Sequence, residues 1–166
     1  MTDSPTFLLD ANVFIEAARR YYAFDLLPQF WAALIDHAER ERLLSIDRVK
    51  VELERGKDDL AGWAKAKFSF AFASTDRAEV AQEFGRLMRW TQGQKQFQNA
   101  AKEKFAKDAD GWLVAFAKVE GMTLVTHEQS KPESRNRVMI PDVCKVANVP
   151  VVDTFQMLRA LGVTFA

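Results

Sequence analysis

Residues 7–15 read Phe-Leu-Leu-Asp-Ala-Asn-Val-Phe-Ile, and this stretch decides the fold that we expect for the 166-residue chain. It begins, just after Pro5, with a short apolar run that is typical of a central strand buried on both faces. After Asp10 the apolar spacing becomes helical and stays so to about Tyr22, with Asn12 as a candidate N-cap. In open parallel sheets, functional residues collect outside the carboxyl ends of the strands. Asp10 is therefore the first candidate for a functional site.

Strands and helices alternate along most of the remaining sequence. We expect further strands over 43–46, 122–126, 138–141 and 149–152, and further helices over 28–38, 47–55, 110–120, 142–147 and 153–161. Residues 57–107 are rich in Lys, Glu, Gln and Ala, and we expect a wholly helical insert that packs beside the sheet as a cap. This alternation predicts an α/β fold: a three-layer α/β/α domain over residues 1–166, with a mostly parallel central sheet.

The composition narrows the class of protein. The hydrophobic share of 48% and the charged share of 28% are ordinary for a globular domain. No apolar run approaches the roughly 20 residues of a membrane-spanning helix, and the first residues lack a basic signal region, so we expect a cytoplasmic protein with no membrane partner. The single cysteine, Cys144, excludes a disulfide within the chain. Because the formal net charge is zero, attraction to a nucleic acid must come from local patches or bound metal.

Four acidic residues lie where a predicted strand ends or a predicted helix begins: Asp10, Glu52, Asp110 and Glu128. Several carboxylates in one pocket repel one another unless a cation neutralises them, and Mg²⁺ and Mn²⁺ prefer such oxygen ligands. A divalent cation held in this way is suited to hydrolysis of phosphodiesters. Each residue also has a simpler interpretation. Asp10 and Asp110 could serve only to stabilise helix N-termini, Glu52 could be a solvated surface acid and Glu128 a loop acid.

Nearly the whole chain resembles the PIN-domain ribonucleases, the family that contains the VapC-like toxins of bacterial toxin–antitoxin pairs. Residues 7–13 resemble the opening strand of that family, whose Asp binds metal and whose Asn orients it. Ser45 with Glu52, residues 110–115 and residues 124–128 resemble the units that carry the second, third and fourth acids. The chain departs from the pattern at Glu128, where Asp is usual. The helical insert and residues 140–144 are longer and more particular than in minimal toxins of the family. They resemble a less characterised PIN subfamily that shares the Trp31, Trp63 and Thr-His-Glu features.

The resemblance implies a Mg²⁺- or Mn²⁺-dependent ribonuclease that binds one or two ions. Water activated by metal at Asp10, Asp110 and Glu128 would attack phosphorus in line, with Glu52 completing the ligand set. The family also implies a toxin that is inhibited by a cognate antitoxin, and a homodimer. RNA is the expected substrate, although nothing in the sequence distinguishes it from DNA.

Other residues have candidate supporting roles. Thr126, at a strand end, is placed to hydrogen-bond an acid and fix its rotamer, and we expect a local hydrogen-bonding role for His127. Asp108 and Asp142 are expected to cap helices. Trp63, Trp90, Trp112 and Cys144 are expected to pack in the core. Basic side chains that could contact phosphates, or simply be solvated, are Arg19, Arg20, Lys131, Arg135 and Arg137.

Two further functions compete with a nuclease. The main alternative is a catalytically weak PIN scaffold that acts as an RNA- or protein-binding module. A haloacid-dehalogenase-like phosphatase also places Asp after its first strand, but it needs a second acid two residues later, where this chain has Asn12. A mononucleotide- or dinucleotide-binding site is not indicated, because the sequence has no Gly-rich phosphate-binding loop.

Overall fold

The computed structural model describes residues 4–165 and contains a parallel five-stranded sheet. The strand order is β3-β2-β1-β4-β5, and the bounds are β1 Phe7–Leu9, β2 Leu43–Ile46, β3 Phe72–Ala73, β4 Thr123–Val125 and β5 Val151–Val152. The predicted α/β fold with a parallel sheet is confirmed.

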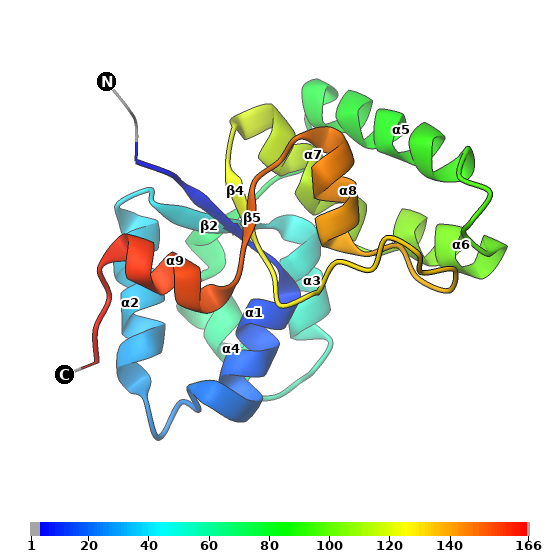
Figure 1. The fold of residues 1–166 in the computed structure, drawn as a ribbon. Helices are drawn as coiled ribbons and strands as arrows, with labels where there is room; N and C mark the ends of the chain where they lie inside the picture. Colours follow the sequence, from blue (N-terminus) through cyan, green and yellow to red (C-terminus); the bar gives the residue numbers. More distant parts are fainter. Residues whose placement is uncertain (1–3, 166) are drawn as a thin grey trace.

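Helices cover both faces of this sheet. Their bounds are α1 Ala11–Glu16, continued by the π-helical turn η1 Ala17–Tyr21, α2 Pro28–Glu39, α3 Asp47–Glu54, α4 Asp59–Ala66, the 3₁₀ turn η2 Ser69–Ala71, α5 Ala78–Gln92, α6 Asn99–Lys107, α7 Asp110–Glu120, α8 Ile140–Ala147 and α9 Thr154–Leu161. Figure 1 shows α1, α2, α4 and α9 on one side of the strands and α5, α7 and α8 on the other. Within the described part of the chain, no helix is both long and apolar enough to cross a membrane.

The opening strand β1 lies at the centre of the sheet, as its apolar sequence predicts. Phe7 is paired with Leu43 of β2 on one side and with Thr123 of β4 on the other. Leu8 and Leu9 are completely buried, because helices cover both faces of the strand. A continuous apolar run is the pattern that such a doubly covered strand requires.

The range 57–107 is not wholly helical, which corrects the prediction. The chain leaves α4, forms the turn η2 and then adds the short edge strand β3, which pairs in parallel with β2 through Ser45 and Phe72. The Phe72 ring packs near Phe14 and Phe68, at centroid distances of 6.3 and 5.4 Å. A strand of two residues is too short to produce an alternating pattern, so its position depends on these tertiary contacts.

Residues 138–141 do not form the expected strand. Val138, Met139 and Ile140 are buried, but Ile140 and Pro141 already form the first turn of α8. Pro is well tolerated there, because an N–H in the first turn has no partner within the helix. Asp142 therefore lies inside the helix and does not cap it. Its carboxylate accepts hydrogen bonds from the Ser130 hydroxyl and the Lys131 amide of the preceding loop.

Helix α5 approaches α7 closely at Gly111. A Cβ atom at this position would lie 3.0 Å from side-chain atoms of both Phe84 and Met88, so any other residue would have to push these side chains aside. The next residue, Trp112, stacks on Phe84 with ring centroids 3.8 Å apart and planes 7° apart. The helix ends at Gly121, as predicted, with a positive φ of 67°. The insert thus packs directly on the helix that begins with Asp110.

Candidate active site

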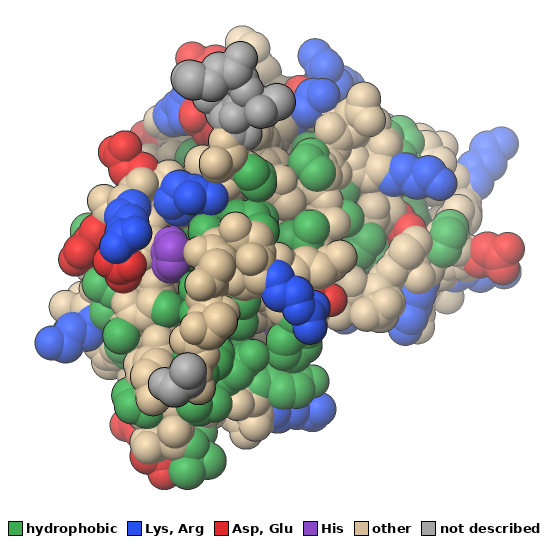
Figure 2. All heavy atoms as spheres, turned by 60° about the vertical axis from the view of Figure 1, so that its left-hand side comes forward, with side chains coloured by type: hydrophobic (Ala, Val, Ile, Leu, Met, Phe, Trp, Pro, Cys, Tyr) green, Lys and Arg blue, Asp and Glu red, His purple; other side chains and the backbone are tan. Residues whose placement is uncertain are grey.

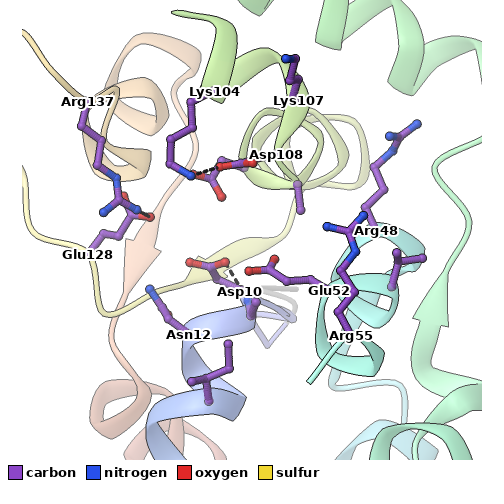
Figure 3. A pocket seen from close by; sticks show the side chains of 15 residues that line it. Asp10, Asn12, Arg48, Glu52, Arg55, Lys104, Lys107, Asp108, Glu128 and Arg137 are labelled. Atoms are coloured by element: carbon purple, nitrogen blue, oxygen red, sulfur yellow. Dashed lines mark hydrogen bonds and ion pairs between the residues drawn. The ribbon is translucent and has the colours of Figure 1, made fainter. Parts of the chain in front are cut away.

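The four predicted acids line one cavity of about 370 Å³. It lies beyond the carboxyl ends of β1, β2 and β4, and its acidic members are Asp10, Glu52, Asp110 and Glu128. Figure 3 shows the carboxyl groups of Asp10 and Glu52 pointing toward each other near its centre. Parallel strands end at the same edge of the sheet, which is why residues far apart in sequence meet there.

Asp10 is held in one orientation by two hydrogen bonds. It is 4% exposed and is the N-cap of α1, with Oδ1 accepting from the amide of Ala11 at 2.7 Å. The Thr126 hydroxyl donates to its Oδ2 at 2.8 Å. Burial raises the pKa of Asp10, the bond from Thr126 lowers it, and the charges of Glu128 and Glu52 raise it again. The residue is therefore both a helix cap and a wall of the acidic cavity.

Asp110 and Glu52 face the same space from two other helices. Asp110 is the first residue of α7, and its pKa is raised by burial and then by the charges of Asp10 and Glu128. Glu52 lies on the exposed side of α3, and partial desolvation raises its pKa, with a further contribution from Asp108. Within residues 4–165, no protein group hydrogen-bonds to either carboxylate. Both retain free oxygen lone pairs.

Glu128 is bound by other protein groups. Its Oε1 accepts from the amide of Ile140, at the start of α8, at 3.0 Å. Its Oε2 forms an ion pair with Nη2 of Arg137 at 3.2 Å, and only 7% of the Glu128 side chain is exposed. Figure 3 shows this pair at one side of the cavity. Arg137 thus supplies the positive charge next to Glu128.

A small polar network connects the strand ends β1 and β4. The Asn12 amide donates from Nδ2 to Oγ1 of Thr126 at 3.2 Å, and its Oδ1 accepts from the amide of His127 at 3.1 Å. Asn12 lies inside α1, so its predicted role as N-cap is wrong: Asp10 is the cap. Nε2 of His127 is in hydrogen-bonding contact with Oγ1 of Thr154 at 2.8 Å. The predicted local role of His127 and the predicted contact between Thr126 and an acid are confirmed.

The carboxylates suit a hard divalent cation in chemistry but are not arranged around one. Among residues 4–165, no three Asp, Glu, His or Cys side chains converge closely enough to hold a metal ion. The donors are nevertheless all oxygen, and the pKa of Asp10 and of Asp110 is raised in part by neighbouring negative charge. A cation would relieve that repulsion. The chemistry of the donor set, all carboxylate oxygen, therefore suits Mg²⁺ or Mn²⁺, whereas its geometry among the residues that the structure describes does not surround an ion.

Most of the basic side chains that were predicted to contact phosphates lie outside the cavity. Arg137 lines the cavity, whereas Arg19 and Arg20 lie on η1, and Lys131 and Arg135 lie in the loop before α8. On the face shown in Figure 2, basic, acidic and apolar side chains are interspersed. The cavity itself has basic side chains that the sequence reasoning missed: Arg48, Arg55, Lys104 and Lys107. For the two arginines, the sequence did contain a signal: the spacing of Arg48, Glu52 and Arg55 places all three on one face of a helix.

Of the remaining candidates, Asp108 does not have its predicted role, whereas Cys144 and the tryptophans do. Asp108 ends α6, lines the cavity and forms an ion pair with Lys104 at 2.6 Å, so it does not cap α7. Cys144 is completely buried, and burial with the charges of Glu128 and Asp10 raises the pKa of its thiol to about 12. A thiol with that pKa is not a nucleophile at neutral pH. Trp63, Trp90 and Trp112 pack against the core, as predicted.

Residues 7–165 match the model of a family described as "Domain of unknown function (DUF4411)". The chain belongs to this family. No curated protein matches the sequence of this DUF4411 member. Similar solved structures include VapBC2 from Rickettsia felis bound to a DNA fragment from its promoter, at 17% identity and a TM-score of 0.54, with 89% of this chain and 98% of that chain covered.

Two further structures share the fold of the DUF4411 chain. FitAcB from Neisseria gonorrhoeae is similar at 19% identity and a TM-score of 0.54, covering 88% of this chain and 96% of that chain. FitAB bound to an IR36 DNA fragment is similar at 17% identity and a TM-score of 0.53, covering 89% and 94%. The predicted PIN-like, VapC-like fold is thereby confirmed.

Proposed function

We propose that this protein is a Mg²⁺- or Mn²⁺-dependent endoribonuclease. One observation carries the proposal: four carboxylates from distant parts of the chain line a single cavity at the carboxyl edge of a PIN-like sheet. Buried acids that raise each other's pKa destabilise the fold. Their presence in one cavity is therefore typical of a functional site. Hydrolysis of a phosphodiester is the reaction for which clustered carboxylates and a hard cation are suited.

Each acid has a distinct part in the proposal. Asp10, Asp110 and Glu52 would hold the cation, and Glu128 would join them on leaving Arg137. When bound, the metal would lower the pKa of water at the site and neutralise negative charge on the phosphodiester. Thr126 keeps Oδ2 of Asp10 in place, and Asn12 fixes the Thr126 hydroxyl in turn. Arg137, once released, is placed to neutralise a substrate phosphate.

The decisive test is cleavage of a mixed pool of structured and single-stranded RNAs. Wild type should cut with Mn²⁺ or Mg²⁺ and stop with EDTA. Asp10→Asn and Asp110→Ala should each lower the cleavage rate by about 10²-fold or more. Removal of a metal ligand should cost more than the roughly 10- to 100-fold lost when a residue that only orients a ligand is removed. Arg86→Gln, which changes an exposed residue of α5 outside the cavity, is the control. Full activity in either acid variant would disprove this site.

We further propose that the nuclease is the toxin of a toxin–antitoxin pair. The support is the fold that it shares with chains of the VapBC2 and FitAB complexes. Expression of wild type should slow cell growth, expression of Asp10→Asn should not, and a cognate antitoxin should restore growth. Harmless expression of the wild type would argue against the toxin role. A homodimer, which the resemblance implies, is tested by sedimentation of the purified protein.

A second candidate function is a binding module without catalysis. The specific observation in its favour is the engagement of Glu128 by Arg137 and Ile140, which leaves fewer carboxylates for a cation. Calorimetric titration with Mn²⁺ separates the two functions. A nuclease should bind Mn²⁺ at micromolar to submillimolar concentrations and lose that binding in Asp10→Asn. A module should bind RNA or protein with no dependence on Mn²⁺.

A further inference from the structure

Helix α3 presents two arginines and an acid to the cavity from a single face. Arg48, Glu52 and Arg55 follow one another at spacings of four and three residues, and all three line the cavity. Such spacings place side chains above one another on a helix. Figure 3 shows Arg48 and Arg55 together on the side of the cavity next to Glu52. Positive charge therefore flanks the carboxylates directly.

Arg48 is fixed in position by uncharged groups. The centre of its guanidinium lies 4.0 Å from the ring centroid of Trp112. Its Nε–H donates to Oγ1 of Thr75 at 3.2 Å, and Asp47 holds Thr75 through both the hydroxyl and the amide. In the described part of the chain, no carboxylate lies within ion-pairing distance of Arg48. An arginine ordered in this way retains donors for an anion and loses little entropy on binding one.

Helix α6 supplies cations from another direction. Lys104 and Lys107 line the cavity, but Lys104 is paired with Asp108 at 2.6 Å. Lys107 forms no ion pair with any residue of the range 4–165. In Figure 3, Lys107 lies beyond Asp108, and the arginines of α3 lie on the side of Glu52. The cations that line the cavity therefore come from two helices, α3 and α6.

We infer that the cavity binds a polynucleotide strand at two phosphates besides the one at the carboxylates, one held by Arg48 and Arg55 and the other by Lys107. The carboxylates repel a phosphate that has no cation beside it, whereas the basic side chains of α3 and α6 attract phosphates. A polynucleotide strand, which carries many phosphates, can contact both helices at once. This inference deepens the proposed function, because it names the backbone contacts that would position the strand. Phosphate contacts do not distinguish sequences, and RNA and DNA share them.

Binding without cleavage tests the inference. Fluorescence anisotropy in EDTA would measure affinity for a labelled single-stranded RNA, and for DNA of the same sequence, over a range of salt concentrations. Arg48→Gln, Arg55→Gln and Lys107→Gln should each weaken binding by about tenfold, as expected for the loss of one charged contact. Each should also reduce the slope of log affinity against log salt by about 0.7. An unlabelled mononucleotide should compete far less well than the strand.

Two controls keep the result interpretable. Arg86→Gln removes an exposed charge on α5 outside the cavity and should change neither affinity nor slope. Arg48→Lys keeps the charge, so the salt slope should be retained while affinity falls, because lysine lacks the planar fork that stacks on Trp112. Arg55 and Lys107 are exposed, so their variants test the contacts even if Arg48→Gln impairs folding.

The outcomes separate this inference from the proposed function. Unchanged affinity and salt slope in Arg55→Gln and Lys107→Gln, or no binding by wild type at low salt, would overturn the inference. Cleavage by wild type with Mn²⁺ would still support the nuclease in that case. Conversely, wild type could bind the strand, with weaker binding in the variants, and yet cleave no RNA or DNA. That result would support the two phosphate subsites and contradict the nuclease.

Discussion

The hydroxyl of Thr126 donates a hydrogen bond to Oδ2 of Asp10 at 2.8 Å, so that the end of β4 fixes the carboxylate at the end of β1. Oγ1 of the same threonine accepts from Nδ2 of Asn12 and from the amide of Glu128. The Thr126 hydroxyl thus hydrogen-bonds to three residues at the edge of the cavity. Its removal should affect the reaction more than the fold.

Thr126→Val should therefore lower metal-dependent cleavage by about 10- to 100-fold, the usual effect of removing a group that orients a metal ligand. Valine has nearly the same shape as threonine, so the melting temperature should change much less than activity. Thr126→Ser keeps the hydroxyl and should restore most of the rate. Kinetics of the three proteins, with circular dichroism of each, measure the difference. Equal cleavage rates for Thr126→Val and wild type would show that Asp10 does not need the hydrogen bond from Thr126.

The acidic cavity should destabilise the metal-free protein as pH rises. Burial and the charges of Asp10 and Glu128 raise the pKa of Asp110 in the folded state above its unfolded value, so the folded state holds the proton more tightly. The free energy of unfolding should then fall as pH rises from about 4 to the raised pKa and level off above it. Thermal melts in EDTA across this range measure the trend.

Asp110→Asn removes that titration. In EDTA above neutral pH this variant should be more stable than wild type, and its melting temperature should rise by about 2–4 °C for each kcal/mol added to the free energy of unfolding. The same substitution should abolish the proposed activity. Asp25→Asn, which changes an exposed acid between η1 and α2, is the control and should leave the trend intact. A melting temperature that rises with pH in wild-type protein would contradict the assignment of repulsion to this cavity.

In the proposed metal site, Arg137 would compete with a cation for Glu128. The ion pair between them has one exposed partner and is worth about 0.2–1 kcal/mol. Arg137→Gln should consequently tighten Mn²⁺ binding by up to about fivefold, and calorimetry would measure it. Arg135→Gln, on a neighbouring exposed side chain, should leave the affinity unchanged. Weaker Mn²⁺ binding in Arg137→Gln would mean that the ion pair helps to form the metal site.

Gly111 should tolerate a side chain poorly because of its close packing. In Gly111→Ala the new methyl group would press on Phe84 and Met88, and overpacking of this kind costs about 1–3 kcal/mol. Gly62→Ala is the matched comparison. No atom lies within 4 Å of the added carbon in α4, so this variant should gain about 0.5–1 kcal/mol from helix propensity. Chemical denaturation of both proteins would measure the contrast.

The central strand and the position of its acid follow from the sequence alone. Residues 7–9 are apolar without interruption, and only a strand covered on both faces accommodates such a run. The convergence of Asp10, Asp110 and Glu128 was predictable because parallel strands end at one edge. These predictions depend on local pattern and topology, which the sequence displays directly.

Contacts between distant segments were beyond the reach of sequence patterns. The stacking of Arg48 on Trp112 depends on how α3 and α7 pack, and the engagement of Glu128 by Ile140 depends on the course of the loop before α8. The edge strand β3 was missed for the same reason, since two residues carry no periodic signal. The cavity's acids were thus predictable, whereas most of its cations were not.

The place of β1 between β2 and β4 has a consequence for the order in which the molecule is made. A nascent chain that ends before residue 110 already contains Asp10 and Glu52, but it lacks β4, Thr126 and two of the four acids. Its cavity cannot form until residues 123–137, which include β4 and Glu128, have left the ribosome. A harmful activity at this site would therefore be absent during most of synthesis and would arise only when the chain is nearly complete.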